Sequence, residues 1–304
     1  MGIFLGIDGG GSKTICVIGN ERSVLGTGNA GASNLVRVGE ERAREAIRAA
    51  FEQACGMAKV TPAEIQRACV GIAGGGRSEI AGKVQRFVSE CVSGEIQVVG
   101  DMVIALEAAF GGEPGVVVIA GTGSIAYGRN SVGGIARAGG WGHAISDEGS
   151  GHWIGRAAVA ATMRAYDEGR KTILIEHVMN AWRLSNHEQI VLAANASPPP
   201  DFAELLPVVL NAADAGDPTA AAVLTQAGRE LAGLAKIVLA KLFSEESAPV
   251  AMSGGVFRNS ALMRQVFYNT LGSEFPAIVV RQEINDPVMG ALDLARRGVR
   301  TAKL

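Results

Sequence analysis

The stretch Gly6-Ile7-Asp8-Gly9-Gly10-Gly11-Ser12-Lys13-Thr14 decides the fold. The apolar residues 3–7 predict a buried strand that runs into the glycines, and residues 14–18 predict a second strand after them. A continuous apolar run at 115–120 repeats this layout, because it leads directly into Gly121-Thr122-Gly123-Ser124. Two units of strand, glycine turn and strand, about a hundred residues apart, predict one fold used twice.

Both glycine turns have the composition of a phosphate-binding site. In a tight turn, successive backbone N–H groups can converge on an anion, and glycine lets the main chain approach phosphate oxygens closely. Asp8 precedes the first turn, and each turn carries a hydroxyl side chain, Ser12 in the first and Thr122 in the second. An ordinary β-hairpin is the alternative for either turn alone. The two matching turns together favour phosphate binding.

Other nucleotide-binding motifs are excluded by their context. Residues 26–31 fit the pattern G-x-G-x-x-G, but a dinucleotide site needs a helix from the last glycine, and the helical period begins only near Gly39. Residues 121–126 fit as well, yet the sequence after them is strand-like and interrupted by glycines, which predicts a hairpin. A P-loop is excluded because Ser12, and not glycine, precedes Lys13.

The rest of the chain predicts an α/β protein. Strands are expected at 67–72 and 95–99, and the spacing of apolar residues over 39–57 predicts a helix between the strands. The second half is mostly helical around a strand at 249–253, and Asp286-Pro287 predicts the N-terminus of a last helix. The other helices expected in that half cover 148–167, 172–184, 201–213 and 217–244.

Composition and charge limit the partners to be expected. The 304 residues are 48% apolar and 19% charged, and the formal net charge is −2, so nucleic acid is not an expected partner. No uncharged run reaches the roughly 18 residues of a membrane span, so we expect a cytoplasmic protein without a membrane partner. The four cysteines form no C-x-x-C pair, which favours buried thiols over a disulfide or zinc site.

Taken together, these motifs resemble those of the N-acetylglucosamine kinases in the BadF/BadG/BcrA/BcrD-type ATPase family, within the sugar kinase, actin and Hsp70 superfamily. The resemblance covers the whole chain, and the stretch from Gly139 to Gly149 is its most specific part. The motifs that carry it are residues 6–14, Gly100-Asp101, Gly121-Thr122-Gly123-Ser124, Gly139-Gly140-Trp141-Gly142-His143 with Asp147-Glu148-Gly149, and Ser253-Gly254-Gly255-Val256-Phe257.

This resemblance implies an α/β fold with two ribonuclease-H-like, actin-like ATPase domains that flank a nucleotide-binding cleft. The first domain is expected at residues 1–111 plus 287–304, with the last helix returning to it, and the second at 112–286. ATP and Mg²⁺ are the implied cofactors, and a homodimer is the implied assembly. The implied reaction is phosphorylation of the 6-hydroxyl of an amino sugar, with N-acetylglucosamine as the expected substrate.

The resemblance also implies roles for individual residues in phosphoryl transfer. Asp8 is expected to hold Mg²⁺ through water, and Asp101 to be both the catalytic base and a sugar contact. An N-cap for the helix predicted at 102–110 is the alternative role for Asp101. The expected phosphate and nucleotide contacts are Gly10, Gly11, Ser12, Lys13, Gly121, Thr122, Gly123, Ser124, Gly254 and Arg258.

Sugar recognition is expected from two segments of the chain. An amide supplies a donor and an acceptor, and a carboxylate accepts hydrogen bonds from ring hydroxyls. A cap of the helix at 148–167 is the alternative for Asp147, and a place in the core is the alternative for Trp141. The expected sugar contacts besides Asp101 are Asn34, Gly140, Trp141, Gly142 and Asp147.

Three alternative functions remain at this point. A glucosamine kinase would differ from an N-acetylglucosamine kinase at one position of the sugar only. An ATP-driven switch would keep the two phosphate turns without needing the base and the sugar contacts together. An activator ATPase of the dehydratase type needs cysteine ligands for an iron–sulfur cluster, and here the cysteines are confined to residues 16–91.

Overall fold

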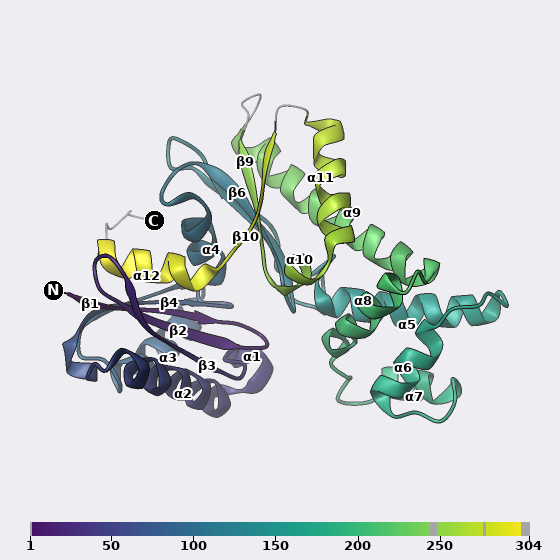
Figure 1. Cartoon of the computed structure of the whole chain (residues 1–304), viewed down its shortest axis with the longest axis horizontal. Coiled ribbons are helices and arrows are strands. Elements are labelled where there is room, and N and C mark those ends of the chain that lie inside the picture. The colour runs from purple at the N-terminus through teal and green to yellow at the C-terminus, as the bar shows by residue number, and fades with distance from the viewer. Residues whose placement is uncertain (1, 244–247, 276–277, 299–304) are drawn as a thin grey trace. The chain divides into compact units, whose positions relative to one another are not determined.

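The computed structural model describes residues 2–243, 248–275 and 278–298, and the chain forms two compact units. Unit 1 comprises residues 1–117 and 285–304, and unit 2 comprises residues 118–284. Each unit is built around a five-stranded sheet with helices (Figure 1). We keep the domain boundaries expected from the sequence, 111/112 and 286/287, as a prediction.

The sheet of unit 1 is mixed and has the strand order β3-β2-β1-β4-β5. β1 pairs antiparallel with β2 across the first glycine turn, and β2 pairs antiparallel with β3. β4 and β5 extend the sheet parallel to β1, so the carboxyl ends of these three strands share one edge. The strands are β1 Ile3–Gly9, β2 Thr14–Gly19, β3 Val24–Ala30, β4 Ile65–Ile72 and β5 Glu95–Gly100.

Hydrophobic clusters cover both faces of this sheet. Alternate residues of a strand point to opposite faces, and Leu5 packs in the cluster with α2 and α3 while Phe4 packs in the cluster with α4 and α12. In the second cluster, Ile104 of α4 and Leu292 of α12 are fully buried. The helices of unit 1 are α1 Leu35–Val38, α2 Glu40–Ala58, α3 Ser78–Ser89, α4 Asp101–Phe110 and α12 Pro287–Arg297, with a 3-10 turn at Pro62–Glu64.

Strand β3 approaches α2 closely because glycines lie at their contact. A Cβ atom at Gly26 would overlap the carbonyl oxygen of Ala54, and one at Gly28 would overlap that of Ala50. The G-x-G-x-x-G pattern at 26–31 thus belongs to a strand that packs on a helix. This observation confirms that the pattern is not a dinucleotide loop.

The sheet of unit 2 has the strand order β10-β9-β6-β7-β8. Read from β8, its first strand is central, with the second and third to one side and the fourth and fifth to the other, as in unit 1. β7 and β8 form the antiparallel hairpin predicted after the second glycine turn. The predicted repetition of one fold is confirmed. The strands are β6 Gly115–Ala120, β7 Ser124–Arg129, β8 Ile135–Gly139, β9 Pro249–Ser253 and β10 Val279–Asn285.

The helices of unit 2 are organised around α9, which packs on β7, β8, α5 and α11. Asp217 caps this helix by accepting the N–H of Ala220 (2.9 Å), and it also accepts the N–H of Ile173 (2.8 Å) just before α6. One carboxylate therefore fixes the starts of two helices. The helices are α5 Gly151–Asp167, α6 Leu174–Trp182, α7 Glu188–Ala194, α8 Leu206–Asp214, α9 Pro218–Leu242, α10 Gly255–Asn259 and α11 Ala261–Glu274, with a 3-10 turn at Phe202–Leu205.

The predicted strands and long helices are present, with shifted boundaries. The helix predicted over 148–167 begins at Gly151, because Ser150 is its N-cap and accepts the N–H of Trp153 (3.2 Å). The helix predicted over 201–213 begins as a 3-10 turn, and the α-helix follows with proline at its second position. Among the described elements, β3, β10, α1, α3, α7 and the 3-10 turn at Pro62–Glu64 have no predicted counterpart.

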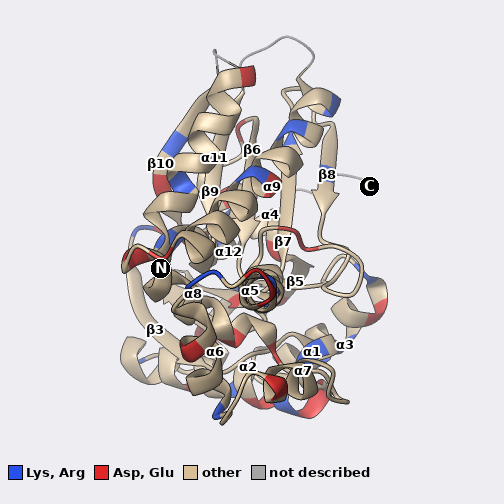
Figure 2. Ribbon diagram, turned by 90° about the vertical axis from the view of Figure 1, so that its right-hand side faces the viewer, with Lys and Arg blue, Asp and Glu red and all other residues tan. Residues whose placement is uncertain are grey.

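Charge and hydropathy are distributed without a dominant region. Acidic and basic residues are spread over helices of both units (Figure 2), and the totals of 28 Lys plus Arg and 30 Asp plus Glu nearly balance. Among the described residues, no helix combines the length and hydropathy that a membrane-spanning segment needs.

Candidate functional site

The first glycine turn joins β1 to β2 at the carboxyl edge of the parallel strands of unit 1. The N–H of Gly10 donates to the carbonyl of Lys13 (2.9 Å), which closes the turn. Gly9 and Thr14 are the last paired residues on either side, and Ser12 and Lys13 are exposed at the tip. The predicted phosphate contacts of unit 1 therefore lie on an open turn.

Carboxylates gather at the same edge. Asp8 is paired in register with Gly71 of β4, Gly71 is paired with Val99 of β5, and Asp101 follows directly after β5. Burial, followed by the charges of Asp101 and Asp286, raises the pKa of Asp8 from 3.8 to about 7, while Lys13 lowers it. The three aspartates are thus close enough for their charges to interact.

Asp101 is the first residue of α4, and the N-cap position belongs to Gly100. Its carboxylate accepts the N–H of Met102, the second residue of the helix (3.0 Å). The alternative in which Asp101 is the N-cap of this helix is therefore wrong. Asp286 is the N-cap residue of α12 but its side chain makes no capping hydrogen bond.

Asn34 lies in a loop that is hydrogen-bonded to the first glycine turn. The N–H groups of Ser33 and Asn34 both donate to the carbonyl of Gly10 (3.1 and 3.2 Å). The side-chain oxygen of Asn34 accepts the N–H groups of Val36 and Arg37 at the start of α1 (3.1 and 3.4 Å). This leaves the amide nitrogen of Asn34 as the group of that side chain that can donate to a ligand.

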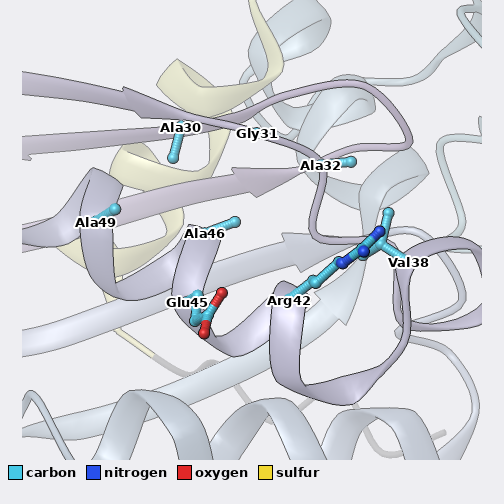
Figure 3. A pocket seen from close by; sticks show the side chains of 8 residues that line it. All are labelled: Ala30, Gly31, Ala32, Val38, Arg42, Glu45, Ala46 and Ala49. Atoms are coloured by element: carbon cyan, nitrogen blue, oxygen red, sulfur yellow. The ribbon is translucent and has the colours of Figure 1, made fainter.

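A pocket of about 340 Å³ lies beside this loop, between it and α2. Its lining residues are mostly small, and its charged residues are Arg42 and Glu45, three residues apart on one face of α2 (Figure 3). Asn34 does not line it, so the predicted sugar contact lies outside this pocket. The lining residues are Ala30, Gly31, Ala32, Val38, Arg42, Glu45, Ala46 and Ala49.

The second glycine turn is anchored to the start of α5. Gly151 and His152 donate their N–H groups to the carbonyls of Gly121 (2.8 Å) and Thr122 (3.3 Å). Ser124 is buried, and its hydroxyl donates to the carbonyl of Glu148 (2.7 Å). These bonds orient the carbonyls of the turn toward the helix.

Asp147 connects the second glycine turn to the segment from Gly139 to Gly142, which we call the tryptophan loop. It is 7% exposed, has a φ of 71°, and its carboxylate accepts the backbone N–H groups of Ser124 and Gly142. Burial nevertheless raises its pKa above the ordinary value. Because Ser150 caps α5, the alternative role of Asp147 as the cap of that helix is wrong.

The segment from Gly139 to Gly142 presents its tryptophan to solvent. Gly139, Gly140 and Gly142 have φ values of 72°, 69° and 95°, which other residues rarely adopt. Trp141 is 60% exposed, and the guanidinium carbon of Arg137 lies 4.1 Å from the centre of its ring. The alternative that Trp141 is a core residue is wrong.

The predicted adenosine contacts follow β9. Gly254 has a φ of 98°, and a Cβ atom there would overlap the carbonyl oxygen of Ala120 at the end of β6. Arg258 is exposed in the last turn of the short helix α10. Glycine at 254 is thus required by the packing of two strand ends, whatever else it contacts.

The chain is similar to known proteins over nearly its whole length. The family described as the BadF/BadG/BcrA/BcrD ATPase family matches residues 5–295. The chain belongs to this ATPase family. The N-acetylmuramic acid/N-acetylglucosamine kinase of Clostridium acetobutylicum is 34% identical over 298 residues, which cover 96% of this chain and 97% of the relative.

Two further proteins resemble the chain over similar lengths. The N-acetyl-D-glucosamine kinase of Dictyostelium discoideum is 30% identical over 310 residues, which cover 96% of this chain and 97% of the relative. The crystal structure of a candidate N-acetylglucosamine kinase from Chromobacterium violaceum has a TM-score of 0.76 and 27% identity, and covers 97% of this chain and 99% of that one. The fold is therefore that of the actin-like ATPases, as predicted.

Within each unit, this ATPase brings most predicted site residues together. In unit 1, Asp8, Asp101, the first turn and Asn34 meet at one sheet edge. In unit 2, the second turn and the tryptophan loop meet at Asp147. Four further residues at these places were not predicted as site residues. Thr14 ends the first motif and Asp286 was predicted only as the start of the last helix, and the other two are Ser33 and Arg137.

Proposed function

We propose that this ATPase transfers the γ-phosphoryl group of ATP to the 6-hydroxyl of an amino sugar, with N-acetylglucosamine as the substrate. The observation that carries the proposal is the shared sheet edge in unit 1, where Asp101 follows β5, Asp8 is the last residue but one of β1 and Asn34 is bonded to the glycine turn. The names and full-length coverage of the relatives support the same reaction.

Asp101 would accept the proton of the sugar 6-hydroxyl as that oxygen bonds to phosphorus. In unit 1 the N–H group of Gly11, with Ser12 and Lys13, would contact the phosphates, while Gly10 would let the main chain approach them, because its own N–H closes the turn. In unit 2 the corresponding donors would be Thr122 and Gly123, because the N–H of Gly121 donates to the carbonyl of Gly123 (2.9 Å). The main-chain N–H of Ser124 donates to the carboxylate of Asp147, and its hydroxyl donates to the carbonyl of Glu148. Ser124 would therefore stabilise the second glycine turn and not donate to a phosphate itself.

The residues around Asp8 fit a divalent cation. Carboxylate oxygens are the ligands that Mg²⁺ prefers, and a cation would offset the burial and the neighbouring negative charges that raise the pKa of Asp8. Among the described residues, no three His, Cys, Asp or Glu side chains form a ready metal cage. Asp8 would therefore hold Mg²⁺ through water, and the bound ion would neutralise charge on the ATP phosphates.

Unit 2 would supply the remaining contacts of both substrates. Gly254 and Arg258 would contact adenosine, because a glycine after a strand lets the purine and ribose approach the main chain. Gly140, Trp141 and Gly142 would contact the sugar, with the indole ring as an apolar face for it. Asp147 would fix the loop through Gly142, besides any bond to a ring hydroxyl.

A coupled ADP-release assay with N-acetylglucosamine, glucosamine, N-acetylmannosamine, N-acetylmuramic acid and glucose tests the reaction. We expect Asp101→Ala to lower kcat about 10²- to 10⁴-fold, the usual contribution of a general base, while ATP still binds. Asp167→Asn, at the exposed end of α5, is the matched control and should keep wild-type turnover. ATP hydrolysis that ignores the sugar, or none at all, would favour the ATP-driven switch.

N-acetylmuramic acid is a second candidate substrate, favoured by Arg137. This side chain stacks on Trp141 and forms no ion pair within the described part of the chain, and that sugar differs from N-acetylglucosamine by an ether carrying a carboxylate. The relative from Clostridium acetobutylicum is named for both sugars. A guanidinium left without a counter-ion beside the sugar contacts suits this carboxylate.

Replacing Arg137 separates the two sugars. We expect Arg137→Gln to lower kcat/KM for N-acetylmuramic acid about 10- to 100-fold, the range for losing a charge-assisted hydrogen bond, and to change N-acetylglucosamine turnover little. Equal losses of kcat/KM for both sugars would instead indicate that Arg137 contacts the phosphates or only orients Trp141. Arg137→Lys keeps the charge and should recover part of the loss.

The assembly and location stay proposals. We propose a homodimer that acts in the cytoplasm, as the family resemblance implies. Light scattering during size-exclusion chromatography would give the mass of the assembly directly, and a monomer at working concentration would contradict the first part.

A further inference from the structure

A pair of buried hydroxyls lies behind the first glycine turn. Thr14, the first residue of β2, and Ser33, in the loop after β3, are both 0% exposed. Their hydroxyl oxygens are 2.8 Å apart, and that of Thr14 also lies 2.7 Å from the carbonyl oxygen of Gly31. Since each hydroxyl has one hydrogen, Thr14 donates to Gly31 and accepts from Ser33.

This pair connects two segments to which the proposed function gives different substrates. Thr14 is paired in register with Gly9, at the base of the phosphate turn. Ser33 precedes Asn34, the proposed sugar contact, and both residues donate their N–H groups to the carbonyl of Gly10. A Cβ atom at Gly9 would lie 2.7 Å from the hydroxyl oxygen of Ser33. The loop thus packs directly on the strand end that carries Asp8.

We propose that Thr14 and Ser33 are positioning residues. They hold the loop that carries Asn34 at a fixed distance from the first glycine turn. The inference rests on the proposed function, and it assigns a role to two residues that contact neither substrate. Phosphoryl transfer depends mainly on placing the acceptor oxygen in line with the phosphorus atom. A displacement of the loop by a fraction of an ångström would therefore move Asn34 and, with it, the acceptor oxygen of the bound sugar.

Kinetics of isosteric variants test this role. Thr14→Val keeps the branched shape and removes both hydrogen bonds, and we expect it to lower kcat about 10- to 100-fold, the loss typical of a 1 Å misplacement. It should raise KM for the sugar and leave KM for ATP nearly unchanged. Thr14→Ser keeps the hydroxyl and should restore most of the activity. Ser33→Ala is the second variant, in case Thr14→Val does not fold.

Two controls separate positioning from general stability. Ile18→Val removes a methyl group from the same strand in the core, away from the hydroxyls, and it should lower the melting temperature without changing kcat or the sugar KM. The double variant Thr14→Val/Ser33→Ala should lose no more activity than the worse single variant, because both remove the same connection. Wild-type kinetics in Thr14→Val, or strictly additive losses, would overturn the proposal.

Hydrogen exchange gives a readout that does not require sugar phosphorylation. A non-hydrolysable ATP analogue bound at the turn should slow amide exchange of Ser33 and Asn34 in the wild type, because both N–H groups bond to Gly10. The same analogue, bound to Thr14→Val, should leave their exchange fast. Equal protection in both proteins would overturn the proposal. If the protein had no sugar kinase activity but the protection still depended on Thr14, the proposed function would be refuted. The role of Thr14 in connecting the loop to the first glycine turn would still stand.

Discussion

Burial and the neighbouring carboxylates Asp101 and Asp286 raise the pKa of Asp8 to about 7. Without a cation, the folded protein therefore prefers Asp8 in its protonated form, whereas the unfolded chain ionises the same group near 3.8. The stability that the protonated form provides is complete below about pH 3.8 and is lost as the pH rises to about 7. Above about pH 7, Asp8 is ionised in the metal-free protein. Its burial and the charges of Asp101 and Asp286 then lower the stability by the full amount.

Asp8→Asn is therefore expected to stabilise the metal-free protein. The neutral amide removes the charge, so the melting temperature in EDTA should rise, and the gain should be larger at pH 8 than at pH 5. Millimolar Mg²⁺ should raise the melting temperature of the wild type at pH 8 but not that of the variant. A wild type that is as stable as the variant at pH 8 in EDTA would show that Asp8 is not under strain from its neighbours.

The candidate site was predictable where function requires an unusual residue beside a recognisable motif. Asp8 and Asp101 follow apolar strands, and Gly140 to Gly142 follow a hairpin, so their positions stand out in the sequence. Thr14, Ser33 and Asp286 are common residue types at loop and strand ends, and only the three-dimensional pairing gives them significance. Asp147 was predicted as a sugar contact, and its bonds to two backbone N–H groups could not be read from its position.

At the scale of elements, the contact between β3 and α2 depends on glycine. Gly28→Ala should destabilise unit 1 by about 1–3 kcal/mol or more, the cost of overpacking, because its methyl group would overlap the backbone of Ala50. Gly56→Ala, in α2 itself, meets nothing within 4 Å and should stabilise the helix by up to about 1 kcal/mol. Chemical denaturation of both variants measures the two changes. Similar stability in both would mean that β3 can move away from the helix.

Glycine also explains which elements were hard to predict. Low β propensity at Gly26 and Gly28 concealed β3, although the close packing on α2 selects these residues. β10 is mostly exposed and carries charged residues, so its sequence lacks the alternation of a half-buried strand. In contrast, α2 and α9 are long and bury a regular apolar stripe, and both were predicted within a few residues of their observed ends.

At the scale of the whole molecule, the repetition of the fold was the most predictable property. A central strand that ends in a glycine turn and returns as a hairpin recurs at β1 and at β6, and the strand orders of the two sheets correspond. The flanking strands could not be ordered from the sequence, because register and neighbours depend on side chains of both partners. In both units a side-chain contact connects the glycine turn to a neighbouring loop. In unit 1 this contact is the pair of Thr14 and Ser33, and in unit 2 it is made by Asp147.

The helix α12 has a consequence for how the polypeptide is made. Its side chains Val288, Ala291 and Leu292 complete the cluster around Phe4 and Ile104, yet the ribosome releases them only after all of unit 2. Until α12 has been synthesised, α4 alone covers this apolar side of the sheet of unit 1. Unit 2 can therefore finish folding before unit 1, which reverses the usual order in which domains mature during synthesis.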